Sequence, residues 1–267
     1  MAMVPQERWV ETDAGRIFVK QWEISESPTS TPIILLHDSL GCVQLWRDFP
    51  LQLAETLNRS VVAYDRLGFG KSDPHAGPIK LDFIEQEARG SFRAVVQQLA
   101  LSEFVVFGHS VGGGMAICCG AEYPATCRGV IAESAQVFVE ELTLQGIRNA
   151  EQSFAAPAQL ERLRRYHGDK AEWVLDAWTS TWLSPAFESW TLDTELRHLR
   201  CPLLAIHGSK DDFGSAAHLE RIGTRTKDAT IEMMTDAGHT PHRENAGAVI
   251  NSVRDWLCRT SPLSQPK

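Results

Sequence analysis

The chain has 267 residues, of which 43% are hydrophobic and 22% are charged, and its formal net charge is −8. These values are typical of a globular protein with one large domain or one domain with an insertion. The acidic balance argues against nucleic-acid binding, because proteins that grip phosphates carry clustered Lys and Arg. No apolar run reaches membrane-spanning length, and residues 1–8 lack the apolar stretch of a signal peptide. We therefore expect a cytoplasmic protein without a membrane partner.

Apolar runs alternate with segments of helical period along most of the chain. The first two strands, residues 8–10 and 17–22, are joined by a tight turn at Asp13-Ala14-Gly15. Six further strands are predicted at residues 33–36, 61–64, 104–107, 129–132, 202–206 and 230–234. Helices are predicted at residues 45–57, 81–101, 115–123 and 246–257. This alternation predicts βαβ units with right-handed crossovers, and hence a mainly parallel sheet.

One segment, residues 135–200, interrupts the alternation and shows helical patterns only. A helix is predicted to begin at Asp169, with Asp169 as its N-cap and Glu172 three residues later. Leu175, Trp178 and Trp182 then fall at i, i+3 and i+7 on one face of that helix. Two interpretations of these tryptophans stay open. They pack a small core of the segment's own, or some of them line a ligand pocket.

The six cysteines are not arranged as metal ligands. They stand at positions 42, 118, 119, 127, 201 and 258, and no two of them form a C-x-x-C pair. A zinc site is therefore not predicted, and we expect reduced, mostly buried thiols that pack as small hydrophobic side chains.

A serine stands at the apex of a predicted strand, turn and helix. The strand Phe-Val-Val-Phe runs into Gly108-His109-Ser110-Val111-Gly112, and small residues continue as a helix. A Gly-x-Ser-x-Gly sequence alone often marks a plain loop, but the flanking elements predict a strained turn that presents the Ser110 hydroxyl. Gly108 and Gly112 are expected to let strand and helix pass closely.

A serine hydroxyl needs a base to become a nucleophile, and the base needs a carboxylate to orient it. Both types of residue follow along the chain, each after a predicted strand. Asp211 is the fourth residue of a Gly-x-x-Asp sequence, and we prefer it to Asp212 as the acid. His239 follows a glycine after the last strand and is the expected base, with His242 as its nearest competitor. Three other histidines in polar helical contexts are expected at the surface: His167, His198 and His218.

Five short motifs, spread over nearly the whole chain, carry a family resemblance. They are His37-x-x-x-Gly41, Tyr64-Asp65-Arg66-x-Gly68-x-Gly70-x-Ser72, Gly108-His109-Ser110-Val111-Gly112-Gly113, Gly208-x-x-Asp211 and Gly238-His239-x-Pro241. Together they resemble the α/β-hydrolase superfamily, in the lid-bearing branch of small esterases, lactonases and carbon–carbon bond hydrolases. The resemblance implies an α/β fold with a mainly parallel eight-stranded sheet flanked by helices. It also implies a hydrolase core at residues 1–135 and 201–267, with a helical lid at residues 136–200.

The same resemblance assigns roles to individual residues. It implies that Ser110 is the nucleophile, His239 the base and Asp211 the acid that orients it. The backbone N–H groups of Ser39 and Val111 would form the oxyanion hole. Residues 65–72 form a structural turn in the family, and we assign them no chemistry.

The chain departs from the family pattern beside the expected oxyanion hole. The family usually has His-Gly after the third strand, where this chain has His37-Asp38. A carboxylate that points inward there would oppose an oxyanion. Aspartate tolerates left-handed backbone geometry better than most residues, so we expect the backbone to be kept and the Asp38 side chain to be turned away.

Several functions remain open on this resemblance. The first is a serine hydrolase that cleaves a small carboxylic ester, lactone or thioester through an acyl-enzyme. The second is hydrolysis of a carbon–carbon bond in a diketone or dienone. This reaction needs a positively charged clamp for a substrate carboxylate. Three arginines of the helical segment could supply it: Arg162, Arg164 and Arg165. A solvent-exposed helix face explains these arginines more simply. The others are cofactor-free oxygen chemistry, which needs His239 and can spare Ser110, and a non-catalytic binding module.

The expected partner is a small-molecule substrate, and no cofactor and no metal is expected. Trp178 and Trp182 are the candidate substrate contacts in the lid. The sequence does not indicate the oligomeric state.

Overall fold

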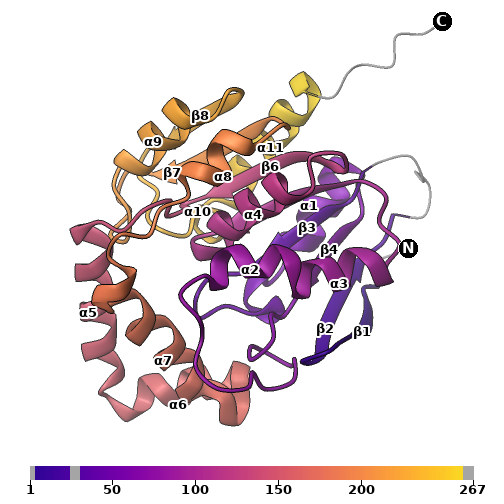
Figure 1. Cartoon of the computed structure of the whole chain (residues 1–267). Helices are drawn as coiled ribbons and strands as arrows, with labels where there is room; N and C mark the ends of the chain where they lie inside the picture. Colours follow the sequence, from indigo (N-terminus) through magenta and orange to yellow (C-terminus); the bar gives the residue numbers. More distant parts are fainter. Residues whose placement is uncertain (1–3, 25–30, 261–267) are drawn as a thin grey trace, which may run out of the picture.

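The computed structural model describes residues 4–24 and 31–260, so residues 1–3 of the N-terminal stretch considered above lie outside the described residues. Eight strands form one sheet in the spatial order β1-β2-β4-β3-β5-β6-β7-β8 (Figure 1). In chain order they are β1 (Gln6–Thr12), β2 (Gly15–Trp22), β3 (Ile33–Leu36), β4 (Val61–Tyr64), β5 (Phe104–His109), β6 (Cys127–Glu133), β7 (Leu203–Gly208) and β8 (Ala229–Met234). β2 pairs antiparallel with β1 and β4, and the remaining pairings are parallel. The predicted mainly parallel sheet is therefore confirmed.

Helices cover both faces of this sheet, because its central strands send alternate apolar side chains to opposite sides. Ile33 and Leu35 belong to the core beneath α1 (Phe49–Leu57) and α11 (Ala246–Thr260). Ile34 and Leu36 belong to the other core, beneath α2 (Phe83–Arg89), α3 (Ser91–Gln98) and α4 (Val111–Glu122). α8 (Asp193–His198) and α9 (Ala217–Arg225) add side chains to that second core. A strand buried on both faces is apolar throughout, which explains the uninterrupted apolar runs of β3 and β4.

The segment between β6 and β7 is helical, as predicted. It contains α5 (Glu141–Phe154), α6 (Pro157–His167), η2 (Gly168–Lys170), α7 (Ala171–Trp182), η3 (Pro185–Phe187) and α8. In Figure 1, α5, α6 and α7 stand together at one end of the molecule, beyond the strands. The two ends of the segment meet, because Phe138 forms an isolated bridge with Thr191 and the Leu192 N–H donates to the Val137 carbonyl at 2.9 Å. Within the described ranges, no helix is both long enough and apolar enough to cross a membrane.

Three helix boundaries differ from the sequence prediction. The helix predicted at residues 81–101 is two helices, because Gly90 between α2 and α3 adopts φ −100° and ψ −108°, outside the helical region. The helix predicted at residues 45–57 begins only at Phe49, after the 3₁₀ turn η1 (Val43–Trp46), since Pro50 is tolerated only in a first turn. Asp169 is not an N-cap. It lies in η2, which runs directly into α7 and leaves no extended residue for a side-chain cap.

Candidate active site

The turn between β5 and α4 carries Ser110 at its apex. Ser110 adopts φ 57° and ψ −124°, a strained conformation for a residue with a Cβ atom. A Cβ on Gly108 would lie 1.8 Å from the carbonyl oxygen of Gly112, and a Cβ on Gly112 would lie 2.2 Å from that of Leu36. The close crossing of strand and helix therefore excludes larger residues at both positions, and it holds Ser110 in its turn at the carboxyl end of β5.

The structure brings Ser110, His239 and Asp211 together from three separate loops. His239, between β8 and α10 (Pro241–Glu244), places Nε2 3.0 Å from the Ser110 Oγ. Its Nδ1 lies 2.8 Å from each carboxylate oxygen of Asp211, which follows β7. The Asp211 side chain is fully buried, and its Oδ1 also accepts the N–H groups of Phe213 at 2.8 Å and Gly214 at 3.1 Å. The three side chains thus form a continuous hydrogen-bonded chain that runs from carboxylate to hydroxyl.

The environment of Asp211 keeps its carboxyl group ionised. Burial by itself raises the pKa of the Asp211 carboxyl, but the hydrogen bond and charge of His239 outweigh burial and leave the pKa lowered. An ionised Asp211 keeps the proton of His239 on Nδ1, so Nε2 can accept the Ser110 proton. Asp212 is exposed, and the structure gives it no contact with His239.

The backbone N–H groups of Val111 and Ser39 are the expected oxyanion hole. Val111 is the first residue of α4, where an amide has no partner within the helix. Ser39 follows β3, and the carbonyl of the same peptide, that of Asp38, accepts Arg66 Nη2 at 2.8 Å and His37 Nδ1 at 2.8 Å. No peptide bond of the described residues is cis, so the Ser39 N–H points opposite to that carbonyl. Two donors on the carbonyl therefore fix the direction of the Ser39 N–H.

A cavity of about 200 Å³ opens beside Ser110. Ser110, Ser39 and His239 lie in its wall, and the rest of the lining is largely apolar and includes Leu40, Ile147, Trp178, Trp182 and Phe213. Trp178 and Trp182 both reach it from α7, which is one of the two interpretations left open by the sequence. The other interpretation also applies to Trp182, whose ring centroid lies 5.2 Å from that of Phe187 and 5.6 Å from that of Trp190.

Comparison with known proteins now decides the family. The model described as "Alpha/beta hydrolase family" matches residues 33–252 of the chain. The chain belongs to the alpha/beta hydrolase family. Among curated proteins it is similar to serine hydrolase BPHL of Mus musculus, with 28% identity over 236 residues. That match covers 84% of this chain and 78% of the relative.

Solved structures of other alpha/beta hydrolases share the fold at lower identity. A thermophilic esterase from Thermogutta terrifontis has a TM-score of 0.72 and 20% identity, covering 96% of this chain and 100% of that one. An enol-lactonase from Burkholderia xenovorans LB400 has a TM-score of 0.72 and 18% identity, covering 94% of this chain and 98% of that one. The family is enzymatic and its relatives are named serine hydrolases and esterases, so this alpha/beta hydrolase is an enzyme.

Asp38 is paired with His109. Asp38 is the residue by which this alpha/beta hydrolase departs from its family pattern. Asp38 Oδ2 lies 3.4 Å from His109 Nδ1, and Oδ1 accepts the Leu40 N–H at 2.9 Å. His109 Nε2 donates to the His239 carbonyl at 2.8 Å. Burial by itself lowers the pKa of His109, but the hydrogen bond to Asp38 and the charge of Glu133 outweigh burial, so the pKa is raised. An imidazole that faces a carboxylate and a carbonyl donates from both nitrogens, so His109 is positively charged and neutralises Asp38.

The expected backbone of Asp38 needs correction. Asp38 keeps a negative φ, so the left-handed geometry that aspartate tolerates is not used. Asp38 is among the residues that line the cavity, and the contacts of its carboxylate are the Leu40 N–H and His109. Burial by itself raises the pKa of Asp38, but the hydrogen bond and charge of His109 lower it further than burial raises it. Pairing with His109 therefore offsets the charge of this carboxylate.

One buried cluster in this alpha/beta hydrolase has the residue types of a metal site. The ligand atoms of His109, Glu133 and His242 lie within 4.8 Å of one another. Glu133, however, accepts both the backbone N–H and Nδ1 of His242, and the two nitrogens of His109 face Asp38 and His239. Because these atoms already have protein partners, we assign the cluster to the scaffold beneath the triad. His242 is thereby bound to Glu133, whereas His239 contacts Ser110.

Sequence reasoning missed two residues that contact the site. Gln136 follows β6, and its Oε1 accepts the Ser110 hydroxyl at 3.3 Å. A polar residue at the carboxyl end of a predicted parallel strand was the available signal. Arg66 was assigned only to a structural turn, yet it donates to the Asp38 carbonyl.

Two of the three histidines expected at the surface are buried, and only His198 is exposed. His167 accepts the Gly70 N–H at 2.9 Å and donates to the Leu40 carbonyl at 3.0 Å. His218 accepts the Val137 N–H at 3.2 Å. A histidine in a polar helix is exposed only when no other segment packs on that helix. The rings of His167 and His218 are buried because each packs against, and forms a hydrogen bond to, a segment far away in sequence. All six cysteines are unpaired, five buried and one exposed, as expected.

Proposed function

We propose that the chain is a serine hydrolase that cleaves a small carboxylic ester, lactone or thioester. The hydrogen-bonded chain Ser110–His239–Asp211 in the wall of a largely apolar cavity is the observation that carries the proposal. Relatives that are named serine hydrolase, esterase and enol-lactonase support the same class of reaction.

In the first half-reaction, the Ser110 Oγ forms a bond to the substrate carbonyl carbon while its proton passes to His239 Nε2. The carbonyl π electrons move to oxygen, and the N–H groups of Val111 and Ser39 stabilise that oxyanion. The C–O or C–S bond then breaks as the oxyanion collapses, and His239 returns the proton to the leaving group. Asp211 stabilises the imidazolium throughout and stays ionised.

In the second half-reaction, water attacks the acyl-enzyme. His239 accepts the water proton at Nε2, the oxyanion forms again at the same two N–H groups, and the proton returns to Ser110 as the acid leaves. The side chain of Asp38, paired with His109, adds little repulsion to either oxyanion.

The segment at residues 136–200 is proposed to act as a lid on a core formed by residues 1–135 and 201–267. The segment leaves β6 at the carboxyl edge of the parallel sheet, where ligands bind in open α/β folds, and Thr191 and Leu192 return to that edge before α8 leads to the start of β7. Trp178 and Trp182 of α7 line the cavity beside Ser110, so this segment supplies apolar wall to the acyl or alcohol group.

The arginines that carbon–carbon bond hydrolysis could use as a clamp do not favour that alternative. Arg162, Arg164 and Arg165 are all exposed on α6, and Arg164 pairs with Glu161 at 2.5 Å and Glu172 at 2.6 Å. They are a solvated helix face. No observation in the described residues favours oxygen chemistry or a binding module over the serine hydrolase.

Labelling with a fluorophosphonate probe tests the proposal. The protein should be labelled once, and Ser110→Ala should lose the label and nearly all hydrolysis of 4-nitrophenyl esters. The residual rate should be about 10³–10⁴-fold above water, the amount left to binding and the oxyanion hole in a triad enzyme. Ser102→Ala, at an exposed loop before β5, is the matched control and should keep both. Full hydrolysis by Ser110→Ala would overturn the proposal.

A further inference from the structure

Arg66 is a buried cation that forms no ion pair within 4 Å among the described residues, although the charge of Glu87 acts on it from a greater distance. Its side chain lies 3% exposed, with the guanidinium carbon 4.1 Å from the ring centroid of Phe69. Nη2 donates to the Asp38 carbonyl, and Nε has no partner. Among residues 4–24 and 31–260, no carboxylate lies within ion-pair distance of this guanidinium. Burial without a paired anion is costly for arginine, so the usual complement of such a group is a ligand.

The guanidinium stands between the site of Ser110 and a second, larger cavity. A narrow space of about 10 Å³, room for about one water-sized group, is lined by Ser39, Arg66, Phe69, Trp178 and Trp182, among others. Ser39, Trp178 and Trp182 also line the cavity beside Ser110. Arg66 and Phe69 also line a cavity of about 510 Å³ on the other side. Arg66 therefore lines two of the three spaces, and the narrow one shares Ser39, Trp178 and Trp182 with the cavity beside Ser110.

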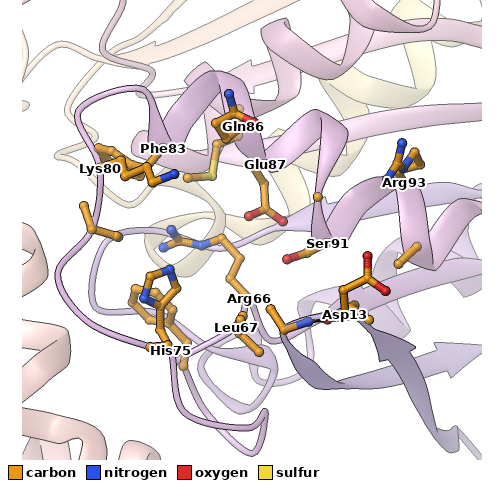
Figure 2. A pocket seen from close by; sticks show the side chains of 18 of the residues that line it. Asp13, Arg66, Leu67, His75, Lys80, Phe83, Gln86, Glu87, Ser91 and Arg93 are labelled. Carbon is orange, nitrogen blue, oxygen red and sulfur yellow. Dashed lines mark hydrogen bonds between the residues drawn. The ribbon is translucent and has the colours of Figure 1, made fainter.

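Figure 2 shows how the larger cavity is lined around Arg66. The Arg66 guanidinium and the Glu87 carboxylate both point into it, with His75 and Lys80 on the near loop (Figure 2). Glu87 accepts the Tyr64 hydroxyl at 2.6 Å, and its charge acts on Arg66 without a direct hydrogen bond to the guanidinium. Arg66 is a buried cation that donates directly to the Asp38 carbonyl. That carbonyl belongs to the same peptide as the Ser39 N–H, the expected oxyanion donor.

A second unpartnered donor belongs to a residue that lines the same narrow space. Trp182 is 2% exposed, and its Nε1–H has no partner. Two residues with buried, unpartnered N–H donors, one of them charged, thus line a space next to the cavity of Ser110, and an acceptor with negative charge satisfies both. Arg66 and Trp182 come from the turn after β4 and from α7, so the space is formed only when the helical segment packs on the core.

We propose that Arg66, with the Trp182 N–H, binds a carboxylate carried by the substrate, so that this enzyme prefers short esters or lactones bearing a free carboxylate. The inference rests on the proposed serine hydrolase function. One oxygen of a carboxylate fits the narrow space, which has room for about one water-sized group beside one cation, whereas a phosphate dianion carries more oxygens and more charge. The group is held near Ser39, so the carboxylate lies a few bonds from the carbonyl that Ser110 attacks.

Paired substrates measure this preference directly. The 4-nitrophenyl monoesters of succinic, glutaric and adipic acid are compared with neutral 4-nitrophenyl esters of the same acyl length. A parallel pair, 3-acetoxypropionate and propyl acetate, places the carboxylate on the alcohol side. The wild type should show a kcat/KM ratio of at least about tenfold in favour of the carboxylate at one chain length or on one side of the ester.

The variants separate the subsite from the oxyanion hole. Arg66→Met should slow both members of a pair, because Arg66 also holds the Asp38 carbonyl, but the ratio should fall at least about tenfold through KM. Arg66→Lys should restore part of the ratio, and Trp182→Phe, which keeps a ring and removes the N–H, should lower it severalfold. Arg93→Met is the matched control, since Arg93 lines the larger cavity without lining the narrow space. Its ratio should equal that of the wild type.

The result that overturns the inference is a wild type without preference, or a preference that survives Arg66→Met. Failure of the proposed function looks different, because the neutral esters would not be hydrolysed and the fluorophosphonate would not label Ser110. In that case calorimetry still tests the subsite without turnover. Monomethyl glutarate should bind the wild type at least about tenfold more tightly than Arg66→Met, and methyl hexanoate should bind both alike. Equal binding of monomethyl glutarate to the two proteins would refute the site.

Discussion

Replacing Asp211 by asparagine tests the roles of the acid and the base together. The two oxygens of Asp211 are not equivalent, because Oδ1 accepts the N–H groups of Phe213 and Gly214. An asparagine must keep an acceptor at that position, so its carbonyl takes the place of Oδ1 and its NH₂ the place of Oδ2. The NH₂ then stands where Oδ2 lay, 2.8 Å from His239 Nδ1. Although the carbonyl at the Oδ1 position lies equally close, a proton on Nδ1 would meet the hydrogens of the NH₂.

This orientation forces the wrong tautomer on the base. An amide N–H donates to Nδ1, so the proton of the neutral imidazole moves to Nε2, 3.0 Å from the Ser110 Oγ. A protonated Nε2 cannot accept the serine proton. We expect kcat to fall about 10⁴-fold, as in a well-studied serine triad, which corresponds to about 5 kcal/mol of barrier. The fold should persist, because both backbone N–H groups keep their acceptor.

The assay is kcat for a 4-nitrophenyl ester, with thermal unfolding as the check on folding. Asp212→Asn is the matched control, since that side chain is exposed next to Asp211. It should change kcat by less than about twofold, as surface substitutions do. The assignment of Asp211 is refuted if a folded Asp211→Asn keeps kcat within tenfold, or if Asp212→Asn costs more.

Three further predictions concern stability and the cavity. Asp38→Asn should destabilise by about 3 kcal/mol, as when a buried ion pair loses one partner. Because the pKa of His109 is raised, this loss should be full at pH between about 4 and 6.5 and should shrink as pH rises through the folded pKa of His109. Urea denaturation of both proteins at pH 5.5 and 8.5 measures it, and an equal loss at both would exclude a charged His109. Gly108→Ala should destabilise by about 3 kcal/mol or more, since the new Cβ meets backbone at 1.8 Å, whereas Gly247→Ala, which meets no atom within 4 Å, should be neutral or stabilising. Trp178→Ala should move the preferred acyl chain to greater length in a 4-nitrophenyl ester series; an unchanged profile with lowered stability would mean that the ring only packs.

The sequence predicted the parts of the site that depend on neighbouring residues in the chain. A strand, a turn with two glycines and a helix are local, so Ser110 and its strained backbone could be placed at its apex. Asp211 and His239 could be found because parallel strands all end at one edge, where their following loops gather. The eight strands followed from uninterrupted apolar runs, which only a sheet covered on both faces produces.

The parts that the sequence could not predict depend on contacts between distant segments. The Asp38 carboxylate pairs with His109, 71 positions later, and no periodic pattern predicts such a pair. His167 and His218 stand in polar helices, yet packing between the helical segment and the core buries them. Gly90 lay within a good amphipathic pattern, and tertiary packing of two shorter helices overrode the pattern.

The joined ends of the helical segment have a consequence for engineering. Val137 and Phe138 meet Thr191 and Leu192 through backbone contacts, so more than fifty residues leave the core after β6 and return to it at nearly the same point, before α8 leads into β7. The pairing of β6 with β7 should therefore depend little on the length of the segment between them, because the entropic cost of closing such a loop grows only slowly with its length. A shorter or longer segment from a relative can be grafted at these four residues with β6 and β7 left in register, which makes the segment an exchangeable cassette.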